Sequence, residues 1–156
     1  MKTISKSLIE TKKVAKNVLA KILDKKGNKT SQTAMILLLE GDLGSGKTTF
    51  TQALAQELGI KSHLTSPTFV LMKKYRTKHS VFKNLIHLDA YRLNSGQELL
   101  NLGWRELMAD PNNLIVLEWP ERVADLPDGK VGLFTGDESK INFKFIDENT
   151  REIILP

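Results

Sequence analysis

The sequence has 156 residues, with 23 Lys and Arg against 18 Asp and Glu, a formal net charge of +5 and no cysteine. This length allows one domain with a sizeable hydrophobic core and is short for a two-domain enzyme. Without cysteine, disulfides, thiolate metal sites and cysteine nucleophiles are excluded.

The sequence shows no pattern typical of a membrane span or of a secretion signal. Its longest apolar stretch, residues 34–39, is far shorter than the roughly 20 residues that a spanning helix needs. The first residues also lack the apolar segment of a signal peptide. We therefore expect a cytoplasmic protein without membrane contact.

The first half of the chain predicts a helix, a strand and a second helix. Apolar residues at helical spacing predict an amphipathic helix that Thr11 opens and Gly27 ends, with its Lys side chains facing water. An apolar strand follows at 34–40, and then a helix at 48–58, which Gly59 ends.

The rest of the chain is richer in strands. We expect strands at about 69–75, 84–89 and 113–119, a helical stretch at 97–108 interrupted by Gly103, and short β segments at 130–134, 141–146 and 152–155. Alternation of strands and helices followed by strands alone predicts an α/β sheet that is parallel at its centre and mixed at one edge.

A glycine-rich string joins the strand at 34–40 to the helix at 48–58. Residues 41–48 read G-D-L-G-S-G-K-T, a complete Walker A motif. Backbone N–H groups of such a turn converge on phosphate oxygens at the positive end of the helix dipole. Lys47 is then expected to reach the β- and γ-phosphates and Thr48 to bind Mg²⁺. We therefore predict a single-domain P-loop NTPase fold over residues 1–156, with a parallel core, antiparallel edge strands and helices on both faces.

Two acids at predicted strand ends, Asp89 and Glu118, are candidates to complete the phosphate site, because ligands gather at the carboxyl ends of parallel strands. We assign Glu118 to the metal and Asp89 to water activation or to sensing of the γ-phosphate. The alternative for either acid is a cap of the following helix. His63, His79 and His87 are too scattered to indicate a zinc site and are interpreted as surface or satisfied residues.

Charge is unevenly distributed along the chain. Residues 1–30 hold nine Lys and only two acids, whereas residues 85–128 hold eight acids and three Arg. A basic side suits contact with RNA or with an acidic protein. The alternative, which we prefer because the Lys residues are not interleaved with aromatics, is an ordinary solvated surface.

Five strings occur together, in order and at matching separations. They are G-D-L-G-S-G-K-T-T-F (41–50), S-P-T-F (66–69), H-L-D-A-Y-R-L (87–93), E-L-L-N-L-G (98–103) and L-E-W-P-E-R (117–122). Over about residues 8–145 the chain thereby resembles the TsaE family, formerly YjeE. These are small bacterial ATPases required for threonylcarbamoylation of the adenosine beside the anticodon in tRNAs reading ANN codons. The resemblance implies ATP and Mg²⁺ as cofactors and TsaB and TsaD as partners. It also implies that tRNA is contacted indirectly, through the complex with these partners.

The resemblance also implies roles for individual residues. ATP contacts are implied for the glycine-rich loop, namely Gly41, Asp42, Leu43, Gly44, Ser45, Gly46, Lys47, Thr48 and Thr49. Mg²⁺ is implied on Thr48 and Glu118, an essential role for Asp89, a switch-like loop at 66–68 that includes Thr68, and Trp119 packed near the nucleotide. Thr11 matches a nucleotide-contacting Thr, and Lys140 lies about where the family often has a basic residue near the base.

The sequence allows three candidate functions. The first is an ATPase, not itself the transferase, in which Lys47 and Asp89 act and a protein partner completes the site. Among the five Arg, only Arg92, near Asp89, is well placed by sequence to stabilise transferred phosphate, and the alternative for Arg92 is a structural role. The second is a small-molecule kinase using the same loop, although no Arg-rich lid is visible. The third is an RNA-binding module, which leaves Lys47, Asp89 and Glu118 unexplained.

Overall fold

The computed structural model describes residues 1–28, 32–124 and 132–156. The strands in these ranges are β1 (Lys2–Ser5), β2 (Met35–Gly41), β3 (Met72–Arg76), β4 (Asn84–Asp89), β5 (Asn113–Glu118), β6 (Ser139–Phe145) and β7 (Arg151–Ile154). The helices are α1 (Leu8–Asn28), α2 (Lys47–Glu57), α3 (Gly96–Asn101), α4 (Trp104–Ala109) and the short 3-10 helix η1 (Pro120–Arg122).

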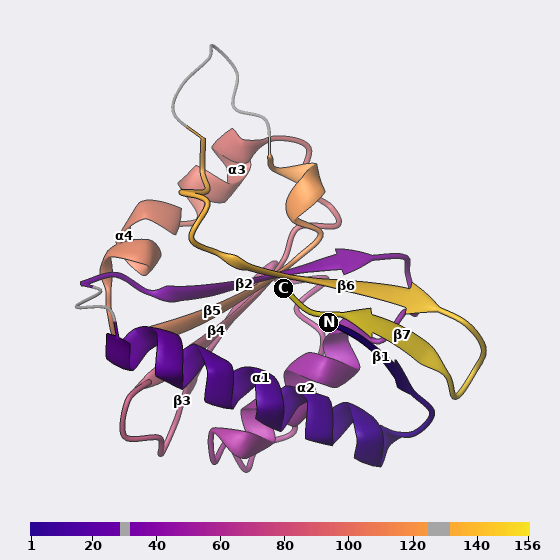
Figure 1. Cartoon of the computed structure of the whole chain (residues 1–156). Helices are drawn as coiled ribbons and strands as arrows, with labels where there is room; N and C mark the ends of the chain where they lie inside the picture. The colour runs from indigo at the N-terminus through magenta and orange to yellow at the C-terminus, as the bar shows by residue number, and fades with distance from the viewer. Residues whose placement is uncertain (29–31, 125–131) are drawn as a thin grey trace.

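The described strands form one sheet in the order β1-β7-β6-β2-β5-β4-β3 (Figure 1). The four central strands, β6, β2, β5 and β4, are mutually parallel. β3 pairs antiparallel with β4 on one side, and β7 pairs antiparallel with β6 and β1 on the other. The prediction of a parallel core with antiparallel edge strands is confirmed, and it places the carboxyl ends of β2, β4 and β5 at one edge.

Helices cover both faces of the sheet, with α1 and α2 on one side and α3 and α4 on the other (Figure 1). Successive residues of β2 alternate between the two layers: Leu37 packs with the core under α1 and α2, and Leu38 with the core under α3 and α4. Because both faces are buried, β2 and β5 contain continuous apolar runs rather than alternating ones, and in β4 the apolar run is interrupted by His87.

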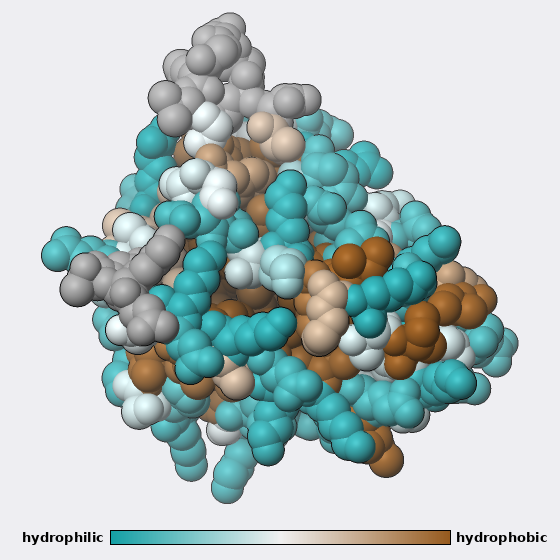
Figure 2. Space-filling view, viewed as in Figure 1, coloured by the Kyte–Doolittle hydropathy of each residue, from teal (hydrophilic) through white to brown (hydrophobic). Residues whose placement is uncertain are grey.

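The outward side of α1 carries exposed Lys side chains, such as Lys12, Lys13 and Lys16. Figure 2 shows hydrophilic side chains over most of the lower part of the molecule, where α1 lies. No helix in the described ranges has both the length and the apolar composition to cross a membrane.

The first helix begins at Leu8 and not at Thr11 as expected. Ser7 and Glu10 explain the earlier start: the Glu10 N–H donates to Ser7 Oγ at 3.2 Å, and the Glu10 carboxylate accepts from the Lys6 N–H at 2.6 Å. This arrangement resembles a capping box, since both side chains satisfy backbone donors at the helix start.

One observed strand was not predicted and one predicted strand is wrong, whereas the predicted break at Gly103 is confirmed. Gly103 has a left-handed φ of 86° and separates α3 from α4. Strand β1 was not expected, because only one of its four residues is strongly apolar. Of the predicted strand at 130–134, residues 130 and 131 lie outside the described residues, and 132–134 form no strand. Leu133 is instead buried, and its carbonyl accepts a hydrogen bond from the indole of Trp104 at 3.0 Å.

Candidate functional site

The glycine-rich loop leaves the end of β2 and enters α2 at the carboxyl edge of the parallel strands. Gly41 lies opposite Phe143 of β6 and has a φ of 130°, and a Cβ placed there would lie 2.0 Å from the Phe143 carbonyl oxygen. Gly46, with a φ of 103°, is the N-cap of α2. Only glycine fits at position 41, and this close approach of the backbone to β6 fixes the path of the loop and the start of the helix.

A cavity of about 240 Å³ lies over this loop. It is lined by residues 43–49 of the loop, by Ser66 and Thr68, by the two strand-end acids, and by Tyr91 and Trp119. The structure therefore brings together most of the residues that the sequence predicted for the site.

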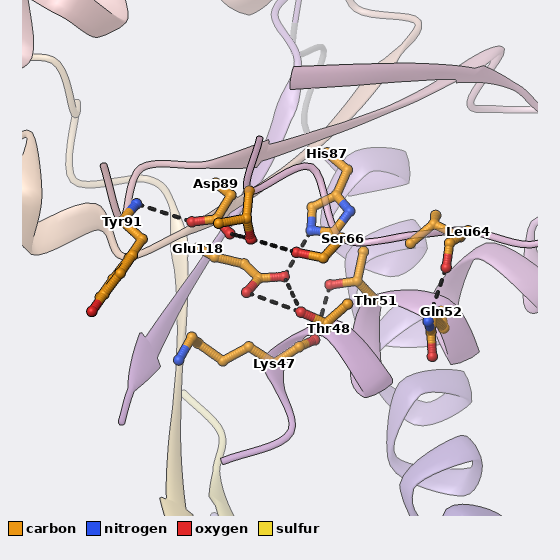
Figure 3. A network of polar contacts seen from close by, with 11 residues as sticks. Lys47, Thr48, Thr51, Gln52, Leu64, Ser66, His87, Asp89, Tyr91 and Glu118 are labelled. Carbon is orange, nitrogen blue, oxygen red and sulfur yellow. Dashed lines mark hydrogen bonds and ion pairs between the residues drawn. The ribbon is translucent and has the colours of Figure 1, made fainter. Parts of the chain in front are cut away.

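Glu118, at the end of β5, is 3% exposed and is held from two directions (Figure 3). Thr48 Oγ1 donates to it, at 3.1 Å from Oε1 and 3.3 Å from Oε2. His87 Nε2 lies 2.7 Å from Oε1. The carboxylate thereby joins β5 to the first turn of α2 and to β4.

Asp89 ends β4 directly opposite Glu118 in the parallel ladder, but it binds a different segment. Its Oδ2 accepts from Thr68 Oγ1 at 2.7 Å, and its Oδ1 accepts from the Tyr91 N–H at 2.9 Å. The Ser66 and Thr68 hydroxyls lie 2.7 Å apart. Asp89 therefore ties the 66–68 loop to the sheet.

Lys47 is folded back onto its own loop. Its Nζ donates to the Gly41 carbonyl at 2.5 Å and to the Asp42 carbonyl at 2.9 Å, and it lies 4.0 Å from the centre of the Trp119 ring. Burial lowers the pKa of Lys47 from its ordinary value of 10.5, and nearby acids, first among them Glu118, act in the opposite direction. An ammonium held this way can exchange carbonyl partners for phosphate oxygens without moving to a new part of the molecule.

Trp119 is held in a left-handed backbone conformation, with a φ of 61°. Its ring lies 5.0 Å from the Tyr91 ring. Left-handed backbone is costly for a bulky residue, and such strain gathers at ligand sites. Here it places the indole face against the Lys47 ammonium.

Sequence reasoning singled out Arg92, and the structure adds Arg151, which lies beside the glycine-rich loop although it is not among the residues that line the cavity. A Cβ placed on Gly46 would lie 3.0 Å from Arg151 Cδ and 3.1 Å from Arg151 Nη1, so the Arg151 side chain lies against the loop. The Arg92 guanidinium lies 4.4 Å from the centre of the Phe69 ring. Arg151 is distant from the motif in sequence and reaches it only because β7 is paired beside β6.

Thr11 and Lys140 do not line the cavity. Thr11 is fully buried and shares a hydrogen bond of 2.8 Å with Ser5 Oγ. Lys140 is exposed, and its Nζ lies 3.5 Å from a Glu40 carboxylate oxygen. Their contacts with a nucleotide remain predictions.

His87 was interpreted as a surface or satisfied residue, and the structure corrects this. Its ring is fully buried and contacts Glu118, but its Nδ1 has no hydrogen-bond partner among the described residues. One signal was present in the sequence: His87 stands two residues before Asp89 in a strand, so both side chains point to the same face.

A glycine-rich loop between a central parallel strand and a helix, facing acids at the ends of two neighbouring strands, defines a mixed α/β domain of the P-loop class. The sequence model of the family described as "Threonylcarbamoyl adenosine biosynthesis protein TsaE" matches residues 5–153. The chain belongs to this family, which takes part in tRNA threonylcarbamoyladenosine biosynthesis.

Several curated relatives have the name "tRNA threonylcarbamoyladenosine biosynthesis protein TsaE". The chain is 37% identical to the one from Rickettsia felis over 143 residues, which is 91% of this chain and 71% of the relative. It is 34% identical to the one from Rickettsia bellii over 151 residues, covering 96% and 90% of the two chains. The crystal structure of Bacillus subtilis YdiB matches with a TM-score of 0.65 at 27% identity, over 99% of this chain and 83% of that one.

Proposed function

We propose that this chain binds ATP with Mg²⁺ in the cavity over the glycine-rich loop and hydrolyses it. The reaction supports threonylcarbamoylation of the adenosine beside the anticodon in tRNAs reading ANN codons, in the cytoplasm and together with TsaB and TsaD. The observation that carries the proposal is the convergence of Lys47, Thr48 and two strand-end acids on one cavity at the start of α2. Membership of the TsaE family supports the pathway.

The loop and α2 suit a triphosphate. Loop backbone N–H groups and the positive end of the α2 dipole attract phosphate oxygens. Lys47 adds a full charge, because it can leave the Gly41 and Asp42 carbonyls for the phosphates. Arg151 adds a second cation beside the loop.

Thr48 and Glu118 fit Mg²⁺. Two ligands at right angles on an octahedral Mg²⁺ lie about 3.0 Å apart, and Thr48 Oγ1 lies 3.1 and 3.3 Å from the Glu118 oxygens. Among the described residues no group of three or more His, Cys, Asp or Glu side chains could hold a metal ion. The remaining ligands are then phosphate oxygens and water, with Glu118 bound directly or through one water. When bound, Mg²⁺ supplies neutralising charge to the β- and γ-phosphate oxygens.

Asp89 is the proposed group for orienting water at the γ-phosphate. Its hydrogen bond with Thr68 makes its position depend on the 66–68 loop. Beside this loop lie side chains that a partner can cover: Phe69 is 82% exposed, Val70 57% and Leu43, at the tip of the glycine-rich loop, 74%. Apolar exposure at the rim of a site favours docking of a protein, which supports completion of the site by TsaB and TsaD.

The test is phosphate release by the purified chain, alone and with TsaB and TsaD, alongside ATP binding. We expect binding by the chain alone, slow release, and faster release in the complex. Glu118→Gln keeps the side-chain shape and removes a charge, so it should weaken the Mg²⁺ dependence of binding. Equal rates with and without partners would refute the partner-completed mechanism. Transfer of the phosphate to a small molecule and not to water would indicate a kinase.

A further inference from the structure

His87 is a buried side chain with no role of its own in the proposed reaction. Its Nε2 lies 2.7 Å from Glu118 Oε1, and its Nδ1 has no partner in the described part of the chain. A carboxylate that binds a cation has no hydrogen to give, so with a cation at Glu118 the His87 Nε2 is the donor. A buried ring nitrogen without a partner costs free energy that an apolar side chain of similar size would avoid. Packing alone therefore gives no reason for a histidine here.

The consequence of this contact is an asymmetric carboxylate. Glu118 Oε1 accepts from His87 at 2.7 Å and from Thr48 at 3.1 Å, from opposite sides (Figure 3). Glu118 Oε2 has only the longer contact of 3.3 Å with Thr48. Since Thr48 has one hydrogen to share between the two oxygens, the asymmetry comes from His87: Oε1 carries the short contact with His87, and Oε2 is the oxygen left for a cation or its water shell.

This asymmetry matters because cations differ in what they require. Mg²⁺ takes six ligands in near-ideal octahedral geometry and uses single oxygens of one or two carboxylates. Ca²⁺ takes six to eight ligands at longer distances and accepts a carboxylate through both oxygens. A glutamate with one oxygen already occupied suits the first ion better than the second.

We propose that His87 is a positioning residue that restricts Glu118 to one free oxygen and so selects Mg²⁺ over Ca²⁺ at the nucleotide site. The inference rests on the proposed function, because it assumes that a cation accompanies ATP in this cavity. It adds a residue, and a specificity, that the glycine-rich motif does not contain.

The test compares ATP binding in Mg²⁺ and in Ca²⁺, by titration calorimetry on the whole chain. His87→Leu removes the donor and keeps an apolar side chain of similar size, whereas His87→Gln keeps an N–H donor at nearly the same reach. His63→Leu is the matched control, since His63 lies in an exposed loop. Thermal melting without metal or nucleotide reports on the fold of each variant.

We expect His87→Leu to raise the half-saturating Mg²⁺ concentration roughly 10-fold or more, because loss of a side chain that hydrogen-bonds to a metal ligand typically lowers metal affinity by about this factor. The value for Ca²⁺ should change little, so that the preference for Mg²⁺ shrinks. His87→Gln should restore most of the preference, and His63→Leu should leave it unchanged. If His87→Leu does not fold, His87→Gln is compared with His87→Asn, whose amide is too short to reach Glu118.

An equal loss of affinity with both ions, or an unchanged preference in folded variants, would show that His87 is merely structural and would overturn the inference. Wild-type protein that binds no ATP with either ion would instead refute the proposed function itself. The two failures are therefore distinguishable in one set of titrations.

Discussion

Replacing Lys47 with alanine tests the site most directly, because the structure shows which contacts this side chain must break in order to bind phosphate. In the free protein its ammonium donates to two loop carbonyls and contacts the Trp119 ring at 4.0 Å. Binding of ATP exchanges these partners for phosphate oxygens. The effect of Lys47→Ala on affinity is therefore the difference between the two sets of contacts.

The magnitude follows from this exchange. Attraction between an ammonium and one phosphate charge at 4 Å is about 4 kcal/mol at an effective dielectric constant of about 20. When Lys47 turns to the phosphates it loses its contact with the Trp119 ring, which offsets about 1 kcal/mol of this gain. The hydrogen bonds that the ammonium makes with carbonyls and those that it makes with phosphates are taken as equal in free energy. A net loss of about 3 kcal/mol corresponds to a dissociation constant for ATP raised by about two orders of magnitude.

The assay is tryptophan fluorescence during titration with Mg²⁺ and ATP. The chain has two tryptophans. Trp104 is fully buried in the core, whereas Trp119 lines the cavity and contacts Lys47, so the signal should come from Trp119. Calorimetry checks the variant independently of the fluorescence. Lys16→Ala is the matched control, because Lys16 is exposed on α1.

Without nucleotide, the melting temperature of Lys47→Ala should be close to that of wild type. The variant loses the hydrogen bonds of the ammonium, but it also avoids the free-energy cost of burying a charge. A folded variant whose ATP affinity stays within about threefold of wild type would refute the reasoning, because that equals less than ~1 kcal/mol. A similar loss in Lys16→Ala would show that net charge, and not the site, controls affinity.

Four further predictions concern Gly41, Thr68, Asp89 and the titration of Lys47. Gly41→Ala should lower the free energy of unfolding in urea by about 4 kcal/mol or more, because its Cβ would overlap a backbone carbonyl of β6. Gly44→Ala, with open space around it, should cost only about 1 kcal/mol, and equal losses would contradict the overlap. Thr68→Val should leave ATP affinity nearly intact and lower partner-stimulated phosphate release about tenfold or more, the equivalent of one hydrogen bond to a charged group. Asp89→Ala should do the same, whereas a parallel loss of binding would make Asp89 a ground-state ligand. Finally, because burial lowers the pKa of Lys47, ATP affinity should fall as the pH rises through that pKa, starting below 10.5, while the contribution of Lys47 to folding stability rises over the same window. Lys47→Ala should show neither trend, and a wild-type affinity that stays constant up to pH 10.5 would contradict the assignment.

The sequence by itself determined the features that follow from local rules. The Walker A string lies between an apolar strand and a helix, and residues 43–49 do line the cavity. Gly103 divides a helical stretch because it adopts the left-handed conformation that other residues avoid. Asp89 and Glu118 end neighbouring parallel strands, as two apolar runs that each finish in an acid indicated.

Only the tertiary structure decided which residues meet across the sheet. Strand order brings Arg151 of β7 against Gly46, and the parallel register sets His87 beside Glu118. The fold also brings the Lys47 ammonium over the Trp119 ring. This contact depends on the left-handed backbone conformation of Trp119, which secondary-structure propensities do not predict. These pairs are far apart in the chain, so no local pattern specifies them. They depend on the order and register of strands, which the packing of both layers fixes together.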